Sequence, residues 1–221
     1  MRFLLLSSLL FWSLAPVFGQ DNAEQLVRSV YAKMRVVKSY EADMRIDADI
    51  PMLRMQRVEG KLLFKQPNKL DIKSKSLAVL PKQGFADFGK FISDSSAFTA
   101  VFSGDEKLGG VLTRMVQVLP GNSKGDLILA KLWIDPLRKL VMRSELTYRS
   151  SGTVLVDYTY GSQQQYALPD QLRFTMDVRN MKIPKAMTAD LHKKRDGKEE
   201  AGKDPNRPAV ILVKLSNYKV N

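Results

Sequence analysis

Hydrophobic and polar residues alternate with a period of two along several stretches of this chain. The clearest stretch begins at Tyr40, where Met44 and Ile46 alternate with acidic and basic residues up to a proline at position 51. Such alternation is typical of a β-strand with one buried and one solvated face. The same period recurs at 58–64, 70–73, 140–148, 154–160, 172–178 and 209–215, and residues 126–134 are apolar on both faces. Short turns separate several of these segments, so we expect an antiparallel sheet of about eight or nine strands.

Three other segments have the spacing of helices. Residues 22–37 carry Leu26, Val30 and Met34 on one face, which predicts an amphipathic N-terminal helix. A phenylalanine-rich segment and residues 108–119, which end at a Pro-Gly-Asn turn, show similar spacing. We expect these two segments to form helices that cover the sheet as a lid. The lid candidates are Phe85, Phe88, Phe91, Leu108, Leu112 and Met115.

The first nineteen positions have the layout of a secretory signal peptide. A basic start is followed by an apolar run over residues 3–17, and Val17 and Gly19 occupy the −3 and −1 positions before Gln20. The run is short for a membrane span, which needs roughly 20 apolar residues. We therefore expect a signal peptide over 1–19, one domain over 20–221, and a soluble protein exported to the periplasm.

Charge and composition narrow the choice of partner. The chain has 35 Lys and Arg against 23 Asp and Glu, a net charge of +12, and no cysteine. A basic protein favours an anionic partner, and export makes nucleic acid an unsuitable one. Anionic lipid headgroups, lipopolysaccharide or an acidic protein remain, and the charge serving solubility alone is an equal alternative.

The residues for catalysis are sparse. His192 is the only histidine and lies beside a charged segment, Lys193 to Pro208, that reads as an exposed loop. Asp43, Asp47 and Asp49 could form a carboxylate cluster, but alternation favours the solvated face of a strand. We expect no catalytic residues, no metal site and no cofactor, and we expect that the protein is not an enzyme.

Several short motifs, in order, resemble the outer-membrane lipoprotein-sorting (LolA-like) family. They are GKLLFKQPNKL at 60–70, LWIDP at 132–136, the Ser151-Gly152 hairpin turn, YALPD at 166–170 and LSNYKVN at 215–221. The resemblance implies an incomplete antiparallel β-barrel of about nine to eleven strands, covered by an N-terminal helix and lid helices. It also implies a carrier that takes the acyl chains of a lipoprotein and moves it across the periplasm between the inner and outer membranes, in the service of outer-membrane lipoprotein sorting. We expect a monomer that meets inner- or outer-membrane proteins.

The apolar faces of the strands supply candidates for lining a ligand cavity, because Met, Tyr and Phe are large or adaptable side chains. A filled core is the alternative. The chain departs from the LolA-like family at Gln66, directly before the turn proline. Known carriers of that family have a basic residue there, which helps to hold the lid closed. An envelope sensor that binds a partner protein is therefore a second hypothesis. The lining candidates are Tyr40, Met44, Ile46, Leu62, Phe64, Ile72, Met142, Leu146, Tyr148, Val156, Tyr158, Phe174 and Met176.

Overall fold

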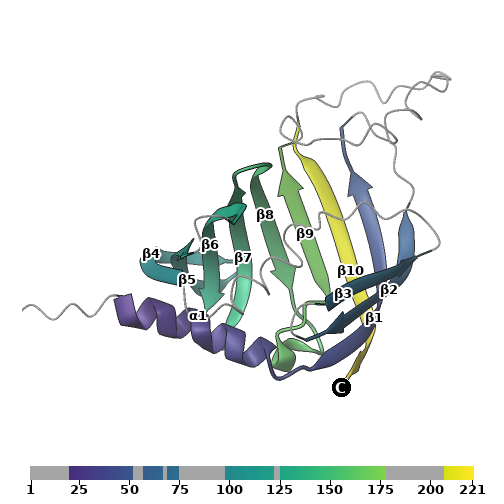
Figure 1. The fold of residues 1–221 in the computed structure, drawn as a ribbon, viewed down its shortest axis with the longest axis horizontal. Helices are drawn as coiled ribbons and strands as arrows, with labels where there is room; N and C mark the ends of the chain where they lie inside the picture. The colour runs from purple at the N-terminus through teal and green to yellow at the C-terminus, as the bar shows by residue number, and fades with distance from the viewer. Residues whose placement is uncertain (1–19, 52–56, 67–68, 75–97, 122–124, 178–206) are drawn as a thin grey trace, which may run out of the picture.

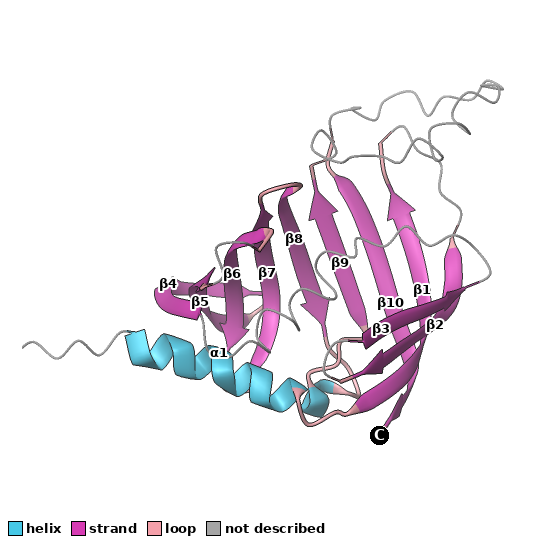
Figure 2. Cartoon of the chain, viewed as in Figure 1, coloured by secondary structure: helices cyan, strands magenta, loops and turns pink. Residues whose placement is uncertain are grey.

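The structure is a computed structural model that describes residues 20–51, 57–66, 69–74, 98–121, 125–177 and 207–221. Within these residues it contains one α-helix, one short 3-10 helix and ten strands (Figures 1 and 2). The elements are α1 (Gln20–Met34), β1 (Ser39–Asp49), β2 (Val58–Lys65), β3 (Lys69–Ser74), β4 (Phe98–Leu108), β5 (Val111–Pro120), β6 (Leu127–Asp135), β7 (Leu140–Tyr148), β8 (Gly152–Thr159), η1 (Gln164–Tyr166), β9 (Gln171–Met176) and β10 (Ala209–Val220).

All ten strands belong to one antiparallel sheet in the order β3-β2-β1-β10-β9-β8-β7-β6-β5-β4. The sheet is open, because β3 and β4 are its two edges and do not pair with each other. In the middle of the sheet the last strand, β10, pairs with the first strand, β1, and Met44 lies opposite Leu215. The mainly β architecture and its strongly curved, incompletely closed sheet are confirmed (Figure 1).

One face of the sheet, which we call the core face, carries the buried side chains. On β1 the buried residues Ala42, Met44 and Ile46 alternate with charged residues, as the period of two predicts. Register carries this face into β2 through Leu62 and into β10 through Ile211, and both are fully buried. The opposite, outer face is the polar one.

A glycine in β2 allows its two neighbours to approach closely. Gly60 lies between Met44 of β1 and Ser74 of β3. A Cβ atom at this position would come within 2.5 Å of the Lys73 carbonyl oxygen, which no side chain tolerates. Glycine is therefore needed here for β3 to pair with β2.

Helix α1 covers part of the core face, and the N-terminal helix is confirmed. Its buried residues Ala23, Val27 and Val30 join the same core cluster as the strands. The helix packs against β4 and η1 and runs along one end of the strands (Figure 1). The Arg28 guanidinium lies 5.0 Å from the centre of the Phe98 ring, so the polar side of α1 also contacts β4.

The helix predicted over 108–119 is wrong, because β4 and β5 form a hairpin there. Gly109 and Gly110 make the turn with φ of +54° and +87°, a conformation that suits glycine. Leu112 is 61% exposed, whereas Val116 and Val118 are fully buried. The apolar spacing of three and four is accidental, and the β-branched residues on both sides of the glycine pair favour strands.

Several predictions fall outside the described residues. The signal peptide over 1–19, the lid candidates Phe85, Phe88 and Phe91, and most of the charged loop that begins at Lys193 all belong to this group. In the part of the chain that the structure describes, no helix is both long enough and apolar enough to cross a bilayer.

Candidate functional site

The core face brings together most of the residues that the sequence proposed as ligand-lining. Eight of them are buried in the core cluster, and three more are half-buried and packed against it. The eight are Met44, Ile46, Leu62, Leu146, Tyr148, Val156, Phe174 and Met176; the three are Tyr40, Ile72 and Tyr158.

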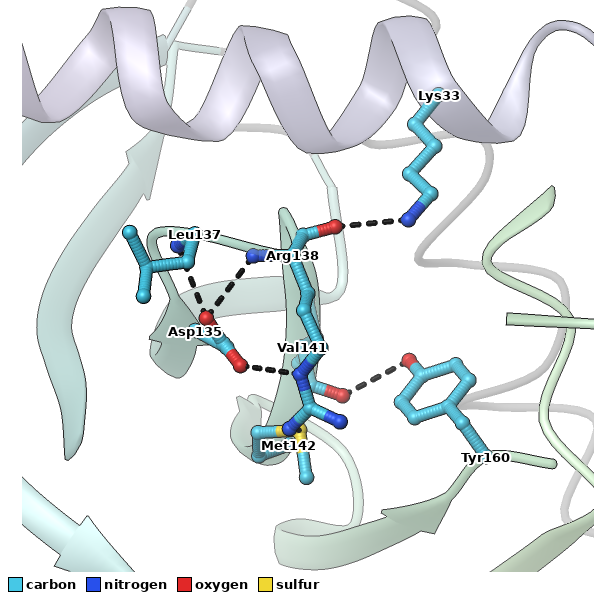
Figure 3. Close-up of polar contacts among 7 residues, drawn as sticks. All are labelled: Lys33, Asp135, Leu137, Arg138, Val141, Met142 and Tyr160. Carbon is cyan, nitrogen blue, oxygen red and sulfur yellow. Dashed lines mark hydrogen bonds and ion pairs between the residues drawn. The ribbon is translucent and has the colours of Figure 1, made fainter. Parts of the chain in front are cut away.

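Met142 departs from this pattern. The pairing of β6 with β7 shifts between Trp133 and Ile134, so Val141 rather than Met142 joins the core cluster. The Met142 sulfur instead accepts a weak hydrogen bond from Arg138 at 3.8 Å (Figure 3). A β-bulge of this kind reverses the alternation, which a strict period of two does not anticipate.

Aromatic rings gather where β1, β2 and β10 end near α1. The Tyr40 ring stacks on Phe64 at 5.2 Å and lies 5.5 Å from Tyr218. The Tyr218 hydroxyl donates to the Pro169 carbonyl oxygen at 2.6 Å. Burial raises the pKa of both tyrosines, so both are neutral at physiological pH. These half-buried rings form an amphipathic margin to the core face.

A second tyrosine pair lies at the end of β8. Tyr158 and Tyr160 stack at 6.4 Å, and the Tyr158 hydroxyl shares a 3.0 Å hydrogen bond with Ser144. The Tyr160 hydroxyl donates to the Val141 carbonyl oxygen at 2.8 Å (Figure 3). Burial raises the pKa of Tyr158 to about 12. Both hydroxyl groups therefore have hydrogen-bond partners inside the protein, which suits a structural role for these tyrosines better than a role in proton transfer.

The core face is incompletely covered at β3, one edge of the sheet. Leu70 and Ile72 point to the core side but are only half-buried, and Phe64 of β2 beside Leu70 is also half-buried. Together with Tyr40 these residues make an apolar surface that is continuous with the core. We call Tyr40, Phe64, Leu70 and Ile72 the open margin. Its chemistry suits an apolar chain.

Gln66, the departure noted in the sequence, binds the end of α1. Its side-chain nitrogen donates to the carbonyl oxygens of Arg35 at 2.7 Å and Val37 at 2.9 Å. Its backbone N–H donates to the Lys38 carbonyl oxygen at 2.9 Å. Carbonyl groups at a helix end lack partners within the helix, so an amide donor fits them. Gln66 thus ties the connection between α1 and β1 to the end of β2.

The turn between β6 and β7 holds the other side of α1. Asp135 is 4% exposed, and its carboxylate accepts hydrogen bonds from the backbone N–H groups of Leu137 and Arg138 and from the Arg138 side chain (Figure 3). Burial alone would raise the pKa of Asp135, but these hydrogen bonds outweigh it and hold the pKa below 3.8. Lys33 of α1 donates to the Arg138 carbonyl oxygen at 2.7 Å, which attaches the helix to this turn.

The carboxylates of β1 do not form a cluster. Asp43 accepts from Asn217 at 2.8 Å, Asp47 pairs with Arg57 at 2.6 Å, and Asp49 pairs with Arg207. The solvated-face interpretation is therefore confirmed. Among the described residues no three His, Cys, Asp or Glu side chains are grouped to hold a metal ion. His192 lies outside those residues.

A groove of about 1590 Å³ borders β1, β2, β3, β9 and β10. Its charged residues alternate along the strands with the buried residues of the core, so the groove is lined mainly by the outer face. Five cations and three carboxylates contribute to it. They are Arg45, Arg57, Lys61, Lys73 and Lys214, with Asp43, Glu59 and Asp170.

Sequence reasoning missed three of these features. Gln66 was singled out only as a departure, and its bonds to α1 depend on contacts between segments about thirty residues apart. Asp135 was noted only as part of the LWIDP motif, although its three donors lie two and three residues further along the chain, which is a local turn signal for an aspartate. The polar groove had no signal beyond alternation, because the strands that line it are distant in sequence.

Comparison with known proteins places the fold. No family model and no curated protein matches the chain. Among solved structures, an outer membrane lipoprotein-sorting protein domain from Vibrio parahaemolyticus aligns with a TM-score of 0.59 and 8% identity over 91% of this chain and 93% of that one. A DUF1329 family protein from Desulfovibrio piger gives 0.57 and 8% identity over 91% and 92%.

A LolA superfamily protein from Nitrosomonas europaea aligns with a TM-score of 0.51 and 10% identity over 88% of this chain and 93% of that one. Each alignment covers nearly the whole of both chains, so the likeness concerns the entire architecture. At these identities it establishes the fold, which is LolA-like, as the sequence motifs had suggested.

Proposed function

We propose that this chain, whose fold is LolA-like, is a periplasmic binding or carrier protein for the acyl chains of lipoproteins or for similar hydrophobic cargo. One observation carries the proposal. The core face of an open sheet is fully buried at its centre but only half-buried at the open margin, Tyr40, Phe64, Leu70 and Ile72. An acyl chain could extend the core there without disturbing its centre.

Binding of this kind is a transfer of apolar surface from water. Each buried methylene contributes about 0.8 kcal/mol, so a long acyl chain gains several kcal/mol without any polar partner. The hydroxyl groups of Tyr158, Tyr160 and Tyr218 have protein partners and would not compete for the ligand. In this proposal the cargo is bound and released unchanged.

Native mass spectrometry of the purified protein with a triacylated lipopeptide tests the proposal. We expect one retained lipopeptide, displaced by a fluorescent fatty acid. Ile72→Gln should weaken probe binding about tenfold, because it places an amide on the open margin. Leu119→Gln, at a residue that is 48% exposed elsewhere on the sheet, is the matched control and should bind normally. Failure to retain any acyl ligand would refute the carrier.

The alternative is an envelope sensor that binds a protein partner without acyl cargo. The polar groove of the outer face favours it, since its mixed charges suit a polar peptide better than a lipid. A pull-down from envelope extract separates the two functions. Loss of the partner in Lys214→Glu, with capture insensitive to removal of the partner's acyl group, would support the sensor.

A further inference from the structure

Two exposed apolar side chains lie where α1 meets the β6–β7 turn. Leu137, at the tip of the turn, is 92% exposed, the most among the large hydrophobic residues that the structure describes. Val36, just beyond α1, is 65% exposed. The bond from the Lys33 side chain to the Arg138 carbonyl oxygen joins the helix end to the turn. We call residues 33–38 and 137–139 the basic rim.

The turn presents Leu137 in a fixed position. The Asp135 carboxylate accepts from Leu137 N–H at 2.9 Å and from Arg138 N–H at 3.0 Å. Lys139 N–H donates to the Asp135 carbonyl oxygen at 2.9 Å, and Lys139 takes a positive φ of +55° that closes the turn. A rigid tip loses little conformational entropy when it is buried in a partner.

The charge of the basic rim has one sign. Residues 31–39 and 136–142 contain five cations and no Asp or Glu. The carboxylate just before the turn, Asp135, is buried and already bonded to Arg138. The cations are Lys33, Arg35, Lys38, Arg138 and Lys139.

We propose that the basic rim docks on the surface of an anionic lipid bilayer, with Leu137 inserted among the headgroups. Each Lys or Arg near such a surface adds attraction, and a protruding apolar tip gains by leaving water. The two apolar side chains stand on separate elements of the chain. A bilayer accommodates such separate points, whereas a protein partner would need a pocket for each. This inference goes beyond the proposed function and does not depend on acyl binding.

Flotation of the purified protein with vesicles tests it. We expect flotation with phosphatidylglycerol-containing vesicles, little with pure phosphatidylcholine, and a decrease as salt screens the cations. Leu137→Gln should lower the partition coefficient about tenfold, since the inserted group is lost. Leu112→Gln is the matched control, because Leu112 is 61% exposed in β5 and outside the basic rim. Arg35→Gln with Lys38→Gln should flatten the salt dependence.

A fluorescent reporter gives a second readout. Leu137→Trp should show a blue-shifted emission on anionic vesicles, while Leu112→Trp should not. No flotation at low salt, an equal loss in Leu137→Gln and Leu112→Gln, or an unshifted Leu137→Trp emission would each overturn the proposal. Retention on an acidic protein without retention on vesicles would also overturn it.

Discussion

The core face and the outer face of the sheet are built from the same strands but are stabilised differently. On β1, Met44 and Ile46 are each 3% exposed, whereas Arg45 and Asp47, which alternate with them, face solvent and form ion pairs. Burial of apolar surface is the larger contribution, because exposed ion pairs add between zero and about 1 kcal/mol. The outer face can therefore change its charges with little effect on the fold, whereas the core face can adapt only at its margin.

The largest difference between the faces should appear in neighbouring residues of β9. Phe174 is 1% exposed on the core face, so Phe174→Ala should reduce the free energy of unfolding by about 3–5 kcal/mol. Arg173→Ala, one residue away on the outer face, should change it by less than about 0.5 kcal/mol. Urea denaturation measures both. Similar losses in the two variants would contradict the contrast.

The next largest effect on stability should come from the buried Asp135 carboxylate at the β6–β7 turn. Asp135→Asn should cost about 1.5–3 kcal/mol, because the charge is lost and the oxygen that accepts from the Arg138 side chain becomes an NH2 group that cannot accept. Since folding lowers the pKa of Asp135, its contribution is present above pH 3.8 and is lost as the pH falls through the folded-state value. The stability of Asp135→Asn should therefore fall less between neutral and acid pH than that of the unchanged protein. Asp47→Asn, a half-exposed carboxylate, is the control, and equal acid sensitivity of the two variants would count against the prediction.

Tyr158 should have a smaller effect with the opposite pH dependence. Tyr158→Phe removes its hydrogen bond to Ser144 and should cost about 1 kcal/mol at neutral pH. Burial of the phenol raises the pKa on folding from 10.0 to about 12, so the native state loses stability as the pH rises from 10 through 12, and Tyr158→Phe should lack this loss. Phenolate absorbance and unfolding, followed together as the pH rises, measure the pH at which Tyr158 ionises. Titration of Tyr158 at its ordinary pKa would show that its site is open to water.

The smallest effect is expected for an ion pair of the outer face. Arg57 and Asp47 lie 2.6 Å apart, with side chains 52% and 36% exposed. A double-mutant cycle with Arg57→Ala and Asp47→Ala should give a coupling of about 0.2–1 kcal/mol that declines with added salt. A coupling as large as the cost of Phe174→Ala would mean that the outer face contributes to stability as the core does.

The pattern of apolar and polar residues by itself predicted most of the strands and much of the core face, but it predicted neither β4 and β5 nor the place of β10 beside β1. Met44, Ile46, Leu62 and Phe174 were predicted to share one face, and they are buried together. Alternation succeeds here because each side chain of a strand has only two directions available. The LolA-like motifs added the open, curved sheet, which alternation alone does not specify.

Only the tertiary structure decided where that rule fails. The β4–β5 hairpin was taken for a helix because apolar spacing was read without the Gly109-Gly110 turn. The shift in the β6–β7 pairing exchanged Met142 for Val141, and a bulge depends on the partner strand. The bonds of Gln66 to the end of α1 follow from contacts between distant segments. The hydrogen bonds of Asp135 are local, because their donors are Leu137 and Arg138. Alternation predicts which side of a strand is apolar, but how far an apolar side chain such as Leu137 is covered depends on the assembled surface.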